Sequence, residues 1–193
     1  MRCSKIPSRR TSTILRNFNA PECFYKDGLR FGCRACSACC RYEAGYVFLS
    51  GEDVAGLAAA KGVTPDEFGK MYCRWVLWAD GKGGTIEQER LSLRERTVGT
   101  GPQKSEDCVF WRDGCTVYEA RPLQCRTYPF WSELLASEEV WRETAEGCPG
   151  IGGGAWHSRA EIEGVLAREQ AQKIITRPFM YSASTQGVSS QNR

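Results

Sequence analysis

Cysteine is the residue type in this sequence that could do chemistry, and its spacing indicates metal binding. The stretch CRACSACC is a doubled Cys-x2-Cys unit with one more cysteine appended: Cys33, Cys36, Cys39 and Cys40. Thiolate is the soft ligand that proteins use for zinc and for iron–sulfur clusters. Because a Cys-x2-Cys pair lets one turn of backbone direct two sulfurs at one centre, this segment predicts a metal site.

The adjacency of Cys39 and Cys40 indicates that this segment does not act alone. Neighbouring side chains leave an extended backbone in different directions, so the two sulfurs can serve different centres or different faces of one cluster. Four more cysteines follow in turn-rich sequence: Cys108, Cys115, Cys125 and Cys148. We expect all eight cysteines to be ligands, as one centre or as two four-coordinate centres.

Both zinc and iron–sulfur chemistry fit this set of donors. Structural zinc usually takes two paired Cys-x2-Cys units, and the second pair is missing because the later cysteines stand singly. Bacterial ferredoxins use Cys-x2-Cys-x2-Cys with a further ligand that precedes proline, an arrangement that the first three cysteines and the distant Cys148-Pro149 echo. We therefore favour an iron–sulfur cluster of the [4Fe–4S] type and keep Zn²⁺ as the alternative.

Arginines beside the predicted ligands could offset the negative charge of a four-thiolate centre. They are Arg34, Arg41, Arg121 and Arg126. Arg126 lies between Cys125 and the apolar segment TYPF, and it is the arginine that we expect to bind the cofactor.

The remaining cysteines and the single histidine have simpler interpretations. Cys3 is incidental in a polar N-terminus, Cys23 is a small buried residue, and Cys73 is a core thiol late on a helix. His157 is the only histidine, so the chain has no second imidazole with which to build a common hydrolase active site. We expect His157 to be a surface side chain. The sequence identifies no catalytic residue and leaves enzymatic activity open.

Composition limits the possible partners and compartment. The 193 residues carry a formal net charge of +3, and residues 1–20 hold five basic and no acidic residues. The charges of the remaining residues are therefore nearly balanced. Such a surface has no field suited to binding the phosphate backbone of a nucleic acid. No apolar run follows the basic start and none is long enough to span a membrane. Eleven cysteines, an odd number without a secretory signal, favour metal ligation over disulfides. We expect a cytoplasmic protein without nucleic-acid or membrane partners.

Local signals predict a small, irregular α+β domain with short helices and few strands, organised around a cysteine-ligated metal centre. Its expected limits are residues 21–176, between a disordered basic N-terminus (1–20) and a disordered polar tail (177–193). Helices are expected at residues 51–61 after a Ser50 cap, at 65–75, at 132–145, and from a Ser158–Glu161 capping box to Ile174.

Strand and turn signals are weaker. Residues 85–97 predict a strand or hairpin, and residues 45–50 a short extended segment. Turns are expected at residues 27–28 and 81–84, and a short hairpin is expected around Asp113-Gly114, with a loop over 99–107 and a turn of helix over 119–124.

Three segments, CRACSACCR, CVFWRDGCTVYEARPLQCRTYPF and CPGIGGG, together resemble the bacterial cysteine-cluster proteins of the YkgJ type, the zinc- or iron-chelating CxxCxxCC domains. The pattern extends from Phe24 to Gly153. The resemblance implies that the CRACSACC cysteines, with Cys108, Cys115 and Cys125, are chelating positions, and Cys148 matches the Cys-Pro-Gly element of such proteins. A related cluster occurs in flagellin lysine methylases, but nothing outside the cluster carries that activity over to this chain.

Three functions are compatible with these features. The first, which we expect, is a metal- or cluster-binding protein whose centre is structural or handles metal. The second is an iron–sulfur enzyme of the redox or methyl-transfer type. The third is an interaction module in which zinc holds the fold and some of the six tryptophans bind a protein partner.

Overall fold

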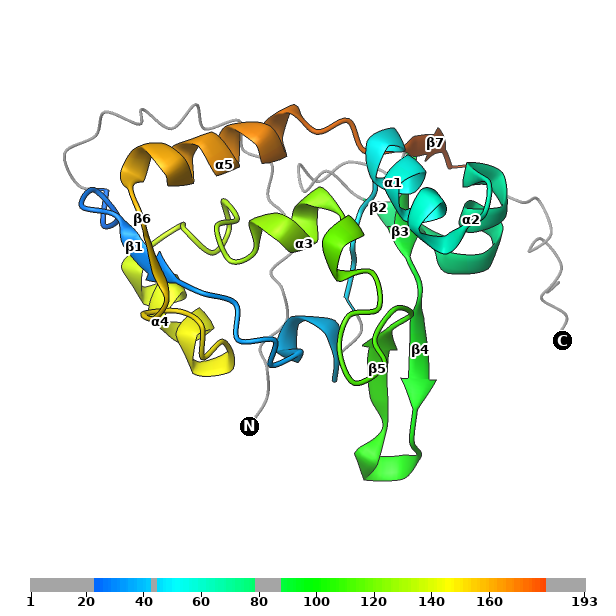
Figure 1. Cartoon of the computed structure of the whole chain (residues 1–193), viewed down its shortest axis with the longest axis horizontal. Coiled ribbons are helices and arrows are strands. Elements are labelled where there is room, and N and C mark those ends of the chain that lie inside the picture. Colours follow the sequence, from blue (N-terminus) through cyan, green and yellow to red (C-terminus); the bar gives the residue numbers. More distant parts are fainter. Residues whose placement is uncertain (1–22, 43–44, 79–87, 180–193) are drawn as a thin grey trace, which may run out of the picture.

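Five α-helices and several short antiparallel strands build the part of the chain that the computed structural model describes, residues 23–42, 45–78 and 88–179 (Figure 1). The helices are α1 (Gly51–Lys61), α2 (Pro65–Tyr72), α3 (Leu123–Thr127), α4 (Glu138–Gly147) and α5 (Arg159–Ala171). Three short 3-10 helices accompany them: η1 (Ala38–Cys40), η2 (Gly101–Gln103) and η3 (Tyr118–Ala120). This mixture confirms the predicted α+β class.

The strands form three small sheets in which every named pairing is antiparallel. The strands are β1 (Leu29–Phe31) with β6 (Ala155–His157); β2 (Cys73–Trp78), β3 (Gln88–Leu93) and β7 (Thr176–Pro178); and β4 (Glu95–Val98) with β5 (Ser105–Cys108). In Figure 1 the β4–β5 hairpin projects from the body, while β1, β6 and α4 lie at the opposite end from α1, α2 and β7.

Side-chain caps explain where the helices begin. In the capping boxes Ser50–Asp53, Thr64–Glu67 and Ser158–Glu161, the hydroxyl accepts from the third helical N–H and the carboxylate accepts from the cap N–H. These contacts confirm the predicted starts of α1, α2 and α5. Gly62, at φ 68°, ends α1 in the left-handed conformation that glycine adopts without steric cost.

Two hydrophobic clusters stabilise the fold. The first joins α1, α2 and β3 and includes Leu49, Leu57 and Phe68, with Cys108 and Cys115 packed against it. The second joins β1, α4 and α5, where the rings of Phe130 and Trp141 stack with centroids 5.8 Å apart. The segment of residues 32–46, which carries CRACSACC, leads from β1 in the second cluster to the first cluster. The predicted ligands therefore lie where the chain passes from one core to the other.

Some local predictions were wrong because tertiary pairing decided the conformation. Cys73 was placed late on a helix, but α2 ends at Tyr72 and Cys73 begins β2. Within the predicted loop of residues 99–107, Ser105 and its successors form β5, because they pair with β4. Helix α5 ends at Ala171 rather than Ile174, because Ile174 bridges to Ser50.

Two further predictions need smaller corrections. The helix expected at residues 132–145 starts only at Glu138, after the cap Ser137. The expected hairpin at Asp113-Gly114 is a tight turn closed by a single bridge between Trp111 and Cys115. Strand β7 crosses the expected domain boundary at residue 176. The N-terminus 1–20, the turn at 81–84 and residues 180–193 of the tail lie outside the described residues.

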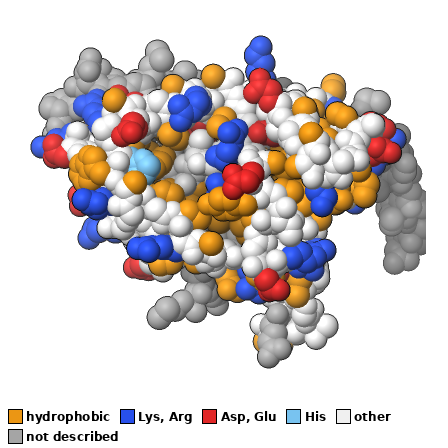
Figure 2. Space-filling model, in the orientation of Figure 1, with side chains coloured by type: hydrophobic (Ala, Val, Ile, Leu, Met, Phe, Trp, Pro, Cys, Tyr) orange, Lys and Arg blue, Asp and Glu red, His pale blue; other side chains and the backbone are white. Residues whose placement is uncertain are grey.

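Among the described residues, no helix combines the length and the apolar character that crossing a membrane requires. On the face seen in Figure 2, basic and acidic side chains are interspersed with hydrophobic areas.

Candidate metal centre

Five of the eight predicted ligand cysteines come together from three separate segments of the chain. Cys39 and Cys40 lie in η1, Cys108 ends β5, Cys115 follows the turn after β5, and Cys125 lies in α3. The sulfurs of Cys39 and Cys40 are 3.7 Å apart. The other three thiols are close enough to change one another's pKa values. Cys108 and Cys125 raise the pKa of Cys40, and Cys115 raises the pKa values of Cys108 and Cys125. We call these five cysteines the central group.

The pKa values of the central group report this proximity. The contact with the Cys40 thiol lowers the pKa of Cys39 to about 7, and the Arg121 charge adds to the effect. The same contact raises the pKa of Cys40, as do burial and the neighbouring Cys39, Cys108 and Cys125. These thiols therefore oppose one another's ionisation, and a bound cation would remove that opposition.

Burial is the first cause for the thiols of the second half of the chain. Burial, with a smaller contribution from the nearby Cys115, raises the pKa of Cys108 to about 11. Burial also raises the pKa of Cys125, with contributions from Cys108, Cys39 and Cys115. Protonated thiols of this kind must lose their protons to bind a metal, so binding is coupled to proton release.

The other three predicted ligands lie on the loop before η1 and at the end of α4. Cys33 and Cys36 are exposed on the loop between β1 and η1, and Cys148 is buried at the end of α4. Gly32, next to Cys33, donates its N–H to the Gly150 carbonyl at 3.1 Å. A Cβ on Gly150 would lie 2.5 Å from the Gly32 oxygen, so this close approach requires glycine. The loop of residues 148–154 thereby lies against the start of the CRACSACC segment.

The arginine beside the thiols is Arg121, whose charge lowers the pKa of Cys39 and opposes the rise at Cys125. Its guanidinium lies 3.5 Å from the ring centroid of Tyr118, and its Nε donates to the Tyr118 carbonyl. Arg126, the arginine that we expected to bind the cofactor, is exposed on α3, and its role stays a prediction. Arg121 precedes α3, between η3 and the Pro122 cap, so no local helical pattern in the sequence favours it over Arg126.

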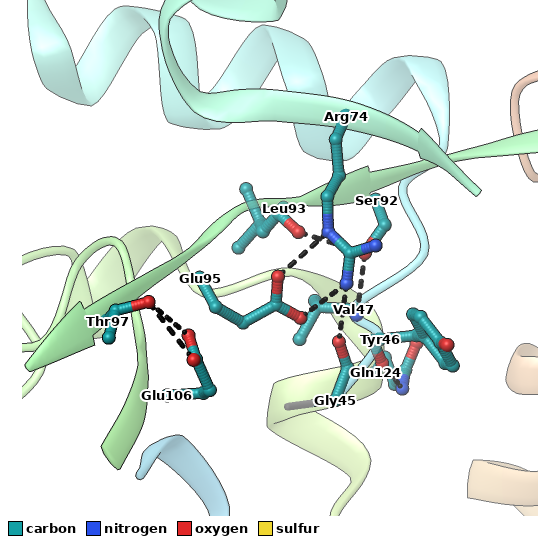
Figure 3. A network of polar contacts seen from close by, with 10 residues as sticks. All are labelled: Gly45, Tyr46, Val47, Arg74, Ser92, Leu93, Glu95, Thr97, Glu106 and Gln124. Atoms are coloured by element: carbon teal, nitrogen blue, oxygen red, sulfur yellow. Dashed lines mark hydrogen bonds and ion pairs between the residues drawn. The ribbon is translucent and has the colours of Figure 1, made fainter. Parts of the chain in front are cut away.

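Helix α3, which carries Cys125, is held by contacts at its first two residues. The Leu123 N–H donates to Asp53 Oδ1 at 2.9 Å. The Gln124 amide donates to the Tyr46 carbonyl at 2.8 Å (Figure 3). It also accepts from the Phe48 N–H at 3.0 Å, so α3 is linked to the extended segment before α1. A helix of five residues has little stability of its own, so these contacts determine where Cys125 lies.

Cys108 and Cys115 are positioned by the β4–β5 hairpin and the turn that follows it. Cys108 pairs with Glu95 in the register of β4 and β5, and Glu95 in turn accepts from Arg74 at 2.7 and 2.8 Å (Figure 3). Asp113 at φ 51° and Gly114 at φ 144° reverse the chain, so that Cys115 bridges to Trp111.

Cys23 and Cys73, the described cysteines outside the predicted ligand set, fit the simpler interpretations. Cys73 is buried in the first cluster, where burial raises the pKa of its thiol to about 11. Cys23 packs half-buried against the second cluster. His157 is half-buried rather than on the surface, since its ring contacts Phe130 and its Nε2 lies 3.2 Å from the Phe31 carbonyl oxygen.

The thiols of the central group are the right chemical type for a zinc or iron ion, because such centres take thiolates in proteins. Among the residues described, no three His, Cys, Asp or Glu side chains converge closely enough to hold a metal ion. Metal binding at this place would therefore require the sulfurs to move toward a common point.

Residues 32–149 match the family model CxxCxxCC, described as "Putative zinc- or iron-chelating domain". The matched segment includes all eight predicted ligand cysteines, and therefore all three segments that contribute to the central group. No solved structure matches the chain significantly.

Proposed function

Because the chain belongs to the CxxCxxCC family, we propose that it binds a zinc or iron ion through thiolates of the central group. The observation that carries this proposal is the meeting of five thiols from η1, from the β5 region and from α3. Soft sulfur donors at one place select zinc or iron over calcium or magnesium, which prefer oxygen.

We propose a structural role for this metal. The CRACSACC segment connects the second hydrophobic cluster to the first, while Cys108 and Cys115 pack against the first cluster. A metal held by both regions would cross-link two parts of the fold that are distant in sequence. Its binding free energy would then contribute to folding, as in other small metal-stabilised domains.

An iron–sulfur cluster is the second candidate, and the number of donors favours it. One zinc ion takes four ligands, whereas the central group offers five thiols, and Cys33, Cys36 and Cys148 stay predicted ligands on neighbouring loops. A cluster, or a second metal, would use the additional sulfurs. The iron–sulfur enzyme and the zinc-stabilised interaction module are extensions of these two candidates.

The test is metal analysis of the full-length chain purified without oxygen, together with an absorption spectrum. We expect stoichiometric metal: a colourless zinc protein or a brown protein with iron and sulfide. Cys39→Ser and Cys125→Ser should lose this metal, whereas Cys23→Ser, a half-buried thiol outside the central group, should keep it. Wild-type metal content in both Cys39→Ser and Cys125→Ser would show that the central group is not the site.

A further inference from the structure

Arg41 and Asp107 are each the direct sequence neighbour of a central-group cysteine, and they contact one another. Arg41 follows Cys40, and Asp107 precedes Cys108. The Arg41 Nε lies 3.6 Å from Asp107 Oδ2. The Asp107 side chain is completely buried, while that of Arg41 is 28% exposed. A buried carboxylate requires a cation or hydrogen-bond donors around it, so this pair joins the CRACSACC segment to β5.

The Arg41 guanidinium also contacts the turn that carries Cys115. It lies 3.9 Å from the ring centroid of Trp111, and Trp111 bridges to Cys115. The Trp111 carbonyl accepts from Arg96 Nη2 at 2.9 Å, which ties the same turn to β4. Through Asp107 and Trp111, Arg41 therefore connects the segment of Cys40 with both later segments of the β5 region.

The backbone at Tyr42 continues this junction. The Tyr42 N–H donates to Ser105 Oγ at 3.0 Å, and Ser105 Oγ in turn donates to the Asp107 carboxylate. The Tyr42 carbonyl accepts from the Glu106 N–H at 3.4 Å. Tyr42 has φ 78°, a conformation that non-glycine residues rarely adopt. Contacts with β5 hold this conformation and so set how the CRACSACC segment meets the hairpin.

Four buried polar atoms at this junction have no hydrogen-bond partner within the part of the chain that the structure describes: Arg41 Nε, Arg96 Nε, Asp107 Oδ2 and Trp111 Nε1. Two of them, Arg41 Nε and Asp107 Oδ2, face each other just beyond hydrogen-bonding distance. A small movement of the CRACSACC segment toward β5 would form this bond. The same direction of movement would bring Cys40 toward Cys108, which is what metal binding requires.

We propose that Arg41 and Asp107 are positioning residues of the metal centre, whose contact sets the distance between the CRACSACC cysteines and those of the β5 region. This inference rests on the proposed function. Neither side chain is a ligand in it: the pair acts through the backbone that it shares with Cys40 and Cys108. Residues that orient metal ligands in this way typically change metal affinity about 10–100-fold when they are replaced.

The test is a Co²⁺ titration of the full-length, metal-free chain in competition with a chelator, because Co²⁺ reports its ligand geometry in the visible spectrum. We expect Asp107→Asn and Arg41→Lys to weaken Co²⁺ binding by about 10–100-fold and to shift the ligand-field bands. The matched control is Glu163→Gln, which removes an ion pair of 2.6 Å with Arg159 within α5, a helix that carries no central-group cysteine. It should leave both affinity and spectrum unchanged.

A double substitution distinguishes positioning from two independent effects. If Arg41 and Asp107 act through one contact, Arg41→Lys with Asp107→Asn should weaken binding no more than the stronger of the two single substitutions. Should Asp107→Asn fail to fold, the partly exposed Arg41→Lys decides the question.

Two failures have different meanings. If the wild-type chain takes up no Co²⁺, the proposed function and this inference are both wrong. If the wild type binds Co²⁺ and Cys125→Ser does not, but Asp107→Asn and Arg41→Lys match the wild type in affinity and spectrum, the metal site stands and the positioning role is wrong.

Discussion

Asp53 offers the sharpest test of how the fold positions a predicted ligand. Its carboxylate accepts from the Ser50 N–H at 3.0 Å and the Ser50 hydroxyl at 2.8 Å in the capping box of α1. It also accepts from the Leu123 N–H at the start of α3 and from the Gln172 amide after α5. One buried side chain thus holds two helix starts and the chain that follows a third helix. We therefore expect Asp53→Ala to destabilise the protein and to displace Cys125.

The magnitude follows from the donors that Asp53→Ala would leave without partners. The backbone N–H groups of Ser50 and Leu123 would lose their acceptor, and Ser50 is itself buried. A buried unpaired donor costs about 1–3 kcal/mol, so two of them cost about 2–6 kcal/mol of unfolding free energy. With a urea slope of about 2 kcal/mol per molar, the middle of the range for small proteins, the midpoint should fall by about 1–3 M.

Glu67→Ala is the matched control, because it removes the same capping-box contacts from α2. Glu67 accepts from the Thr64 N–H at 2.9 Å and from the Thr64 hydroxyl at 2.7 Å, but this box is exposed and holds no second helix among the described residues. Its loss should lower the urea midpoint less than Asp53→Ala does, because solvent can satisfy the freed Thr64 N–H, and should not change metal content.

Urea unfolding of the metal-free variants, followed by circular dichroism, measures both values, and metal titration tests the effect on Cys125. The reasoning is wrong if Asp53→Ala costs no more than Glu67→Ala. It is also wrong in its second part if Asp53→Ala loses stability but binds metal with wild-type affinity.

Three further predictions concern the thiols. In the metal-free protein at about pH 7.5, iodoacetamide should modify Cys39 first, because the Cys40 contact lowers its pKa to about 7. It should modify Cys73 only on unfolding, because burial raises the pKa of that thiol to about 11. Equal modification rates of the two cysteines in peptide mass mapping would contradict this. Since the pKa values of Cys73 and Cys108 rise from 9.0 to about 11 on folding, the stability of the metal-free chain should be complete below pH 9 and fall as pH rises through 11. A urea midpoint that stays constant from pH 8 to 11 would refute the raised pKa values of these two thiols. Zinc affinity should instead increase between about pH 6 and 8, because binding displaces thiol protons. An affinity that does not change with pH would refute zinc binding by thiolates.

Local signals in the sequence predicted the starts of α1, α2 and α5 correctly. Ser50, Thr64 and Ser158 are caps because each hydroxyl meets an N–H three residues later, a relation that the sequence contains completely. Gly62 ends α1 for an equally local reason. The class of the fold follows from these short helices and from the alternation of apolar residues in β3.

Non-local pairing explains what the sequence did not predict. Ser105 and Glu106 have polar side chains typical of a loop, but β4 lies opposite them and makes them a strand. Cys73 continues the apolar face of α2, yet its pairing with Leu93 begins β2 at that residue. In both cases the deciding partner is distant enough along the chain that no local pattern contains it.

The sequence alone determined the chemistry of the candidate site: soft thiol donors, a CxxCxxCC segment, and single cysteines that follow in turns. Residue types and short spacings carry that information, because metal preference depends on the ligand atoms. Only the tertiary structure decided which thiols meet. It brought Cys39 and Cys40 near Cys108, Cys115 and Cys125, and it placed the Arg121 charge near Cys39 and Cys125. The physical reason is that buried contacts of Asp53, Gln124 and Arg41 with distant segments set these positions, and such contacts form only when the whole chain folds.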